Sequence, residues 1–114
     1  MIRASLDFAS GGILSSCRVT GHACFISQDE IKPGENVLCA AVSVLLRTAA
    51  RTLEQHPEIR ISGEAPDPGN FWFKIESWPP EQKGWLKGLS DFLVTGFSDL
   101  KEEYPEMIEL IIKG

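Results

Sequence analysis

The chain has 114 residues, the length of a single domain, and we expect one domain over residues 1–114. A hydrophobic content of 43% and a charged content of 24% are ordinary for a soluble globular protein and argue against the disordered and fibrous classes. The net charge of −5 argues against direct binding of nucleic acid, because such binding depends on clustered lysine and arginine.

The first twenty residues predict a β-hairpin. Residues 2–8 alternate apolar and polar side chains, which is the period of a strand with one buried face. Residues 9–12 contain two glycines and turn the chain, and residues 13–20 predict a second strand. The short glycine-containing connection makes antiparallel pairing of these two strands the natural arrangement.

The middle of the chain predicts a long loop followed by a helix. Residues 25–34 fit no single period and are predicted to be a loop, either a binding segment or a tolerated surface insertion. Asn36 is of the type that caps helices, and the apolar run after it predicts a helix from about residue 36 to residue 55. Polar side chains occupy only a narrow arc of this helix. We therefore expect it to be buried on more than one side, with some contribution from a dimer contact.

The second half of the chain predicts another hairpin, a second helix and a last strand. Residues 58–63 predict a short strand, residues 65–70 a turn, and residues 71–76 an aromatic strand with alternate side chains in the core. Prolines acceptable in a first helical turn open the second helix at residues 78–80. Pro105 ends it, and residues 107–112 predict the last strand. The apolar stripe of this helix, predicted to lie in the core, consists of Trp85, Leu86, Leu89, Phe92, Leu93, Gly96, Phe97 and Leu100.

This order of elements, ββαββαβ, predicts an α+β fold. We expect a two-layer sandwich in which a largely antiparallel sheet of about five strands carries two helices on one face. No apolar run is long enough to cross a membrane, and the amino terminus does not have the pattern of a signal peptide. We therefore expect a cytoplasmic protein, in which the three cysteines are kept reduced.

Cys39 falls in the first turn of the predicted first helix. The positive end of the helix dipole and the unpaired backbone N–H groups there favour the thiolate over the thiol, which prepares a cysteine for nucleophilic attack. His22 lies at the end of the second extended segment, upstream of the loop, and could serve as the base. On residue type alone, a single cysteine near the start of an apolar helix is more often packed than catalytic.

Two short segments around these residues form a joint pattern: Gly21-His22-Ala23 upstream and Cys39-Ala40-Ala41-Val42-Ser43 in the helix. This pattern resembles the ribosomal-processing cysteine proteases of the Prp family, and the resemblance runs along nearly the whole chain. It implies that His22 and Cys39 are the catalytic residues. It also implies that Gly21, Asn36 and Ser43 line the site or orient its groups, and that the enzyme needs no metal and no cofactor.

The family resemblance further implies a substrate and an assembly. Family members are expected to remove the N-terminal extension of a ribosomal large-subunit protein, the one designated L twenty-seven, and to form homodimers. In this chain Asn36 stands where the family usually carries aspartate, and Leu38 where it usually carries valine. Asn36 can cap the helix and orient a histidine, but it brings no negative charge to an imidazolium, so the rate or the pH optimum is predicted to differ. The spacing from His22 to Cys39 is also longer than the family leads us to expect, so substrate gating is predicted to differ too.

The same residues leave alternatives open. Asn36 and the long loop also suit a non-catalytic ribosome-associated or peptide-binding protein on the same scaffold. The other histidine, His56, lies at the far end of the predicted helix, roughly 25 Å from Cys39, and cannot be the base within one subunit. A zinc site formed by Cys17, His22, Cys24 and Cys39 lacks the close Cys-x-x-Cys spacing, so no metal site is predicted.

Overall fold

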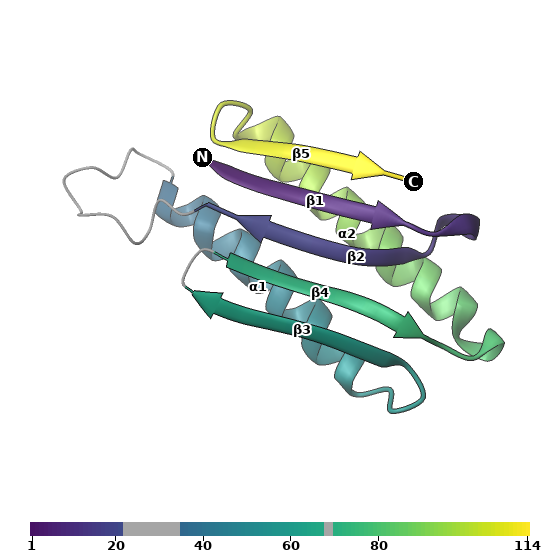
Figure 1. Cartoon of the computed structure of the whole chain (residues 1–114). Helices are drawn as coiled ribbons and strands as arrows, with labels where there is room; N and C mark the ends of the chain where they lie inside the picture. The colour runs from purple at the N-terminus through teal and green to yellow at the C-terminus, as the bar shows by residue number, and fades with distance from the viewer. Residues whose placement is uncertain (22–34, 68–69) are drawn as a thin grey trace.

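The computed structural model describes residues 1–21, 35–67 and 70–114, in which a five-stranded sheet carries two helices (Figure 1). In chain order the elements are β1 (Ile2–Phe8), a short 3₁₀ helix (Ser10–Gly12), β2 (Leu14–Thr20), α1 (Glu35–Glu54), β3 (Arg60–Asp67), β4 (Asn70–Ser77), a second 3₁₀ helix (Pro80–Gln82), α2 (Lys83–Glu103) and β5 (Ile108–Lys113). This order confirms the predicted α+β class. The loop predicted at residues 25–34 lies outside the described residues.

The strands lie side by side in the order β3-β4-β2-β1-β5. Three neighbouring pairs are antiparallel, namely β1 with β2, β2 with β4 and β3 with β4. The fourth pair, β1 with β5, is parallel, because α2 carries the chain back along the sheet before β5 begins (Figure 1). The sheet is therefore largely antiparallel and contains both predicted hairpins.

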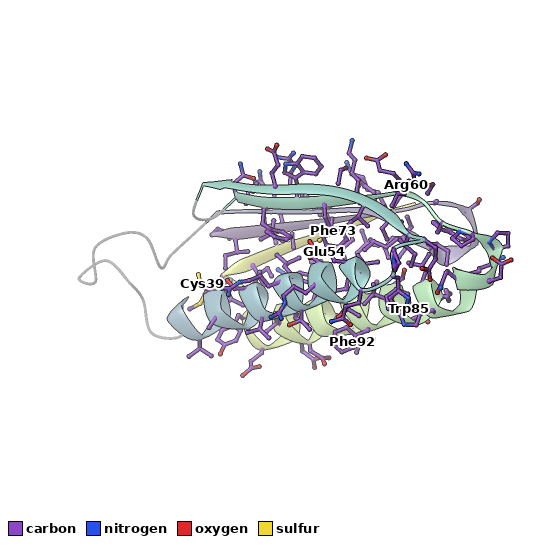
Figure 2. The ribbon with its side chains drawn as sticks, turned by 90° about the horizontal axis from the view of Figure 1, so that it is seen from below. Cys39, Glu54, Arg60, Phe73, Trp85 and Phe92 are labelled. Carbon is purple, nitrogen blue, oxygen red and sulfur yellow. The ribbon has the colours of Figure 1, made fainter. Side chains whose placement is uncertain are left out.

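Both helices lie on the same face of the sheet, and apolar side chains fill the space between the two layers (Figure 2). On β1 the alternate residues Ile2, Ala4 and Leu6 are buried, as their alternation in the sequence predicts. The helices approach each other closely at Gly96, where a Cβ would lie 3.1 Å from the Leu45 Cδ atoms. Burial of each large apolar side chain contributes about 1.5–3 kcal/mol to stability. The largest fully buried ones are Phe73, Phe97, Leu6, Ile13, Leu14, Leu38, Leu53, Leu86, Leu93 and Ile108.

Ser90 on α2 is a polar residue inside this core, with only 1% of its surface exposed. Its hydroxyl accepts a hydrogen bond from the backbone N–H of Leu14 at 2.8 Å. The same hydroxyl donates to the carbonyl of Leu86 at 2.7 Å. Buried polar groups of this kind cost free energy unless they are paired, so the two bonds make Ser90 a specific link between α2 and the start of β2.

The predicted end of the third strand is wrong. The sequence predicts a strand at residues 58–63 and a turn at residues 65–70, whereas β3 runs from Arg60 to Asp67 and continues into the predicted turn. β3 is an edge strand, where a proline such as Pro66 is tolerated because one side of the strand has no neighbour that needs its N–H. The pairing with β4 shifts register between Glu64 and Asp67, which accommodates the change.

The prediction that Phe92 lies in the core is also wrong, because 57% of its surface is exposed. Phe92 lies about 100° around α2 from the fully buried Leu93, and so falls outside the face of the helix that meets the sheet. On α1, Val37 and Val44 are similarly exposed, at 61% and 63%. Within the described part of the chain, neither helix combines the length and the apolar character needed to span a membrane.

Candidate active site

Cys39 lies near the start of α1, on the side of the helix that faces the sheet (Figure 2). α1 begins at Glu35, so Cys39 is the fifth residue of the helix and lies just past its first turn, rather than within it as predicted. Only 7% of the residue is exposed, and it belongs to the hydrophobic core cluster. Its sulfur therefore lies where the packed interior meets the end of the molecule at which α1 starts.

Three elements meet at this end of the sheet: the start of α1, the end of β2 and the start of β4 (Figure 1). Thr20, the last residue of β2, is paired with Asn70, the first residue of β4. β2 leads directly into the segment that carries His22. His22 itself lies outside the described residues, so its pairing with Cys39 remains a prediction.

Gly21, which follows β2, has a backbone conformation that favours glycine. Its φ is +92°, in the left-handed region where a Cβ is strained. A Cβ at this position would also lie 2.0 Å from the carbonyl oxygen of Met1 and 3.2 Å from the Cα of Ile2. Ile2 is itself held by a hydrogen bond that its N–H donates to the carbonyl of Met107 at 3.0 Å. The backbone therefore requires a glycine directly before His22.

The remaining predicted site residues lie along α1. Ser43 is half-buried and lies one turn after Cys39. Asn36 is the second residue of α1 rather than the residue before the helix, so the predicted helix start was one residue late. His56 follows the far end of α1 and packs against Trp85, with the ring centroids 4.1 Å apart. The structure thus gives His56 a packing role at the opposite end of α1 from Cys39.

Cys17 on β2 is a packed cysteine, with 1% of its surface exposed. Burial, and secondarily the negative charge of Asp7, raise the pKa of the Cys17 thiol to about 12. The thiol therefore stays protonated at neutral pH and is a poor nucleophile. Across residues 1–21, 35–67 and 70–114, no group of three or more His, Cys, Asp or Glu residues could hold a metal ion.

Asn70 is a residue at this end of the sheet that sequence reasoning missed, because it was assigned only to a turn. Its Oδ1 atom is buried and has no hydrogen-bond partner among the described residues. A buried acceptor without a partner costs about 1–3 kcal/mol, so such an atom calls for a functional explanation. The sequence shows only an amide residue directly before the aromatic strand, and the pairing of this strand with β2, which leads to His22, is seen only in the structure.

Comparison with known proteins places this arrangement in a wider context. A family model described as cysteine protease Prp matches residues 1–109. Among solved structures, SMU.848 from Streptococcus mutans is 27% identical with a TM-score of 0.76, the match covering 100% of this chain and 96% of that one. No curated protein matches the chain at a significant level.

A second solved structure is an essential ribosomal processing protease, Prp, from S. aureus in complex with a substrate peptide. It is 17% identical with a TM-score of 0.78, and the match covers 99% of this chain and all of that one. This likeness shows that the two chains share a fold. Because the family model spans nearly the entire sequence, the chain belongs to the Prp family of cysteine proteases.

Proposed function

We propose that this cysteine protease removes the N-terminal extension of a ribosomal large-subunit protein, designated L twenty-seven, with Cys39 as nucleophile and His22 as base. The observation that carries the proposal is the convergence of the start of α1, which holds Cys39, with the end of β2, which leads into His22. Membership of the Prp family supports the reaction type. The structure of the S. aureus protein, described as a ribosomal processing protease with a substrate peptide, supports the substrate class.

The proposed reaction is acyl transfer through a thioester. His22 accepts the proton of the Cys39 thiol, and the sulfur forms a bond to the carbonyl carbon of the scissile peptide while the π electrons move to the oxygen. As the carbonyl re-forms, the C–N bond breaks, and the imidazolium returns its proton to the leaving amine. Water then hydrolyses the thioester with His22 as base and restores the thiol. Backbone N–H groups in the first turn of α1 are suited to hold the developing oxyanion.

Two further residues belong to this proposal. Asn70 offers a buried Oδ1 acceptor at the same end of the sheet, and we assign it to a hydrogen bond from a backbone N–H of the bound peptide. The small side chain of Ala40, next to Cys39, leaves space beside the thiol. Asn36 in the first turn of α1 brings no negative charge, so an imidazolium at His22 is stabilised less than it would be by an aspartate at that position.

We also propose that the protein works as a homodimer. Exposed apolar side chains gather on the outer surface of the helix layer, with Val37 and Val44 two turns apart on α1 and Phe92 on α2. Figure 2 shows Phe92 on the side of the helices that faces away from the sheet. A second copy covering this surface would remove these side chains from water. Sedimentation of the wild type and of Val44→Asp tests the proposal: the wild type should be a dimer that the charge dissociates.

The catalytic proposal is tested with full-length ribosomal protein and mass measurement of the products. We expect the wild type and Cys17→Ala to release the N-terminal extension, because Cys17 is packed and protonated. We expect Cys39→Ala to release nothing. If Cys39→Ala cuts as the wild type does, the assigned nucleophile is wrong. If no variant cuts but all bind the ribosomal protein, the peptide-binding role on the same scaffold replaces the proposal.

A further inference from the structure

The two outer strands of the sheet present different edges. The sheet ends in β3 on one side and in β5 on the other. β3 carries the usual protection of an exposed edge, since Arg60 and Glu64 are charged and exposed and Pro66 interrupts the row of N–H groups. β5 contains no proline, pairs with β1 in unbroken register, and has four aliphatic residues among its six. Such an edge is a template for pairing with another strand.

The hydrogen bonds of β5 show which of its backbone groups point outward. The N–H of Ile2 donates to the carbonyl of Met107 at 3.0 Å. Alternate residues of a strand turn their N–H and C=O groups to the same side, so in this parallel pair the odd-numbered residues of β5 face β1. The Ile108 carbonyl, which points away from β1, accepts a hydrogen bond from Lys101 Nζ at 2.9 Å. The part of the edge left for another strand therefore spans residues 110–112.

The side chains of β5 on the outer face of the sheet follow a pattern of charge. Glu109 lies beside Arg3 of β1, whose Nε is 2.8 Å from the Glu109 carboxylate. Lys113 lies beside Asp7 of β1. Ile111 lies between Glu109 and Lys113 on the same face. Along β5 the order is thus negative, apolar, positive, which becomes its own complement when the strand is reversed.

We propose that β5 of one molecule pairs with β5 of a second copy as antiparallel strands, about a two-fold axis at Ile111. A two-fold axis normal to the sheet makes the two strands antiparallel and joins the two sheets into one. Leu110 of each copy then exchanges both backbone hydrogen bonds with Ile112 of the other, which uses the outward groups of both residues. The Ile112 side chain, 49% exposed in one molecule, comes to lie beside Leu110 of the second copy.

Charge selects this register among those that the backbone allows. With the axis at Ile111, Glu109 lies opposite Lys113 of the second copy, and the reverse contact forms at the symmetric position. The row across four strands then reads Arg3, Glu109, and Lys113 and Asp7 of the second copy, with opposite charges at each step. A slip of two residues keeps the backbone pattern but leaves one of the two charges without an opposite partner. The self-complementary charge is the reason for choosing a second copy as the occupant.

This strand contact is separate from the helix-layer contact of Val37, Val44 and Phe92. Figure 1 shows β5 at the rim of the sheet, whereas the exposed apolar side chains lie on the helices. One short pair of strands buries little surface, so we expect weak association, on the order of 0.1 mM. The strand contact therefore forms in concentrated protein, and the dilute protein keeps the state set by its helices. Val44→Asp, which should remove the helix contact, isolates the strand contact.

The test is sedimentation of Val44→Asp from about 10 µM to about 1 mM, over which its mass should change from that of a monomer toward that of a dimer. Lys113→Glu and Glu109→Lys, each added to this background, should weaken the association about ten-fold, because like charges then face each other. An equimolar mixture of these two variants should restore it, because both contacts of the mixed pair again join opposite charges. Glu64→Lys, an exposed charge change on β3, should keep the parental association.

A backbone variant tests the strand pairing itself. Ile112→Pro removes one outward N–H and leaves the ladder with β1 intact, so it should also weaken association while urea unfolding shows a folded protein. The proposal would be overturned by an absence of association at 1 mM, by a mixture that associates no better than either charge variant alone, or by an Ile112→Pro protein that associates like its parent. None of these readings involves cleavage, so they are independent of the protease proposal.

Discussion

Replacing Gly21 by alanine tests whether the turn at the end of β2 builds the site. The new Cβ would lie 2.0 Å from the Met1 carbonyl oxygen, where real contacts stay beyond 3.0 Å, so the Met1–Ile2 backbone must move by about an ångström. That segment is anchored, because Ile2 is 4% exposed and bonded to Met107. The left-handed conformation adds about 1–2 kcal/mol of strain. With one weakened backbone hydrogen bond at about 0.5–1.5 kcal/mol, we expect a loss of roughly 2–3 kcal/mol.

The assay measures the free energy of unfolding in urea together with cleavage of the ribosomal protein. Gly88→Ala is the matched control, since a Cβ there meets nothing within 4 Å on an exposed part of α2. It should stabilise the protein by about 0.5–1 kcal/mol and leave cleavage unchanged. Gly21→Ala should lower kcat/KM by ten-fold or more at a temperature where it is fully folded, because small misplacements of a catalytic segment are costly. Wild-type stability together with wild-type cleavage would refute the reasoning.

Three more outcomes are expected. Ser90→Ala leaves the Leu14 N–H buried without a partner and should lower the free energy of unfolding in urea by about 1–2 kcal/mol. The control Ser62→Ala, which removes an exposed hydroxyl, should lower it by less than about 0.5 kcal/mol. Equal losses would mean that water satisfies the Leu14 N–H. The Cys17 thiol, with its pKa raised to about 12, keeps its proton in the folded state but loses it near the ordinary pKa of 9.0 when the chain is unfolded. The free energy of unfolding should therefore fall between these two pH values, by up to about 1.4 kcal/mol per pH unit. Cys17→Ala should lack this part of the pH dependence. Asn70→Ala should leave the urea midpoint unchanged or raised while lowering kcat/KM for the ribosomal protein, and a variant with full activity would remove Asn70 from the site.

The sequence predicts most of the fold because its local patterns agree with the final packing. The alternation of Ile2, Ala4 and Leu6 identifies β1, and the apolar run after Asn36 identifies α1 to within a residue. The errors lie at positions whose structure depends on contacts with residues that are distant in the chain. Pro66 is compatible with β3 only because that strand is at the edge, and the order of strands cannot be read from local periodicity. Phe92 fits the spacing of the apolar stripe, but the sheet covers a narrower face of α2 than the stripe.

Some residues of the candidate site could likewise be predicted from the sequence, and others could not. The joint pattern around His22 and Cys39 is local and was found from the sequence, whereas the need for a glycine at position 21 follows from the close approach of Met1 in the structure. Asn70 could not be identified, because the burial of its Oδ1 depends on how β4 starts beside β2. Long-range packing therefore adds residues to a site whose reactive groups a short motif already suggests.

The parallel pairing of β1 with β5 has a consequence for how the enzyme is made. Ile2 is synthesised long before Ile108, its partner in the sheet, so one side of β1 lacks this neighbour until β5 has been synthesised. Contacts this far apart in the chain form slowly, and an open strand edge is a place where nascent chains associate. We therefore expect the nascent chain to gain a complete sheet only after β5 has left the ribosome. A protease built in this way would then stay inactive until its last strand has joined the sheet.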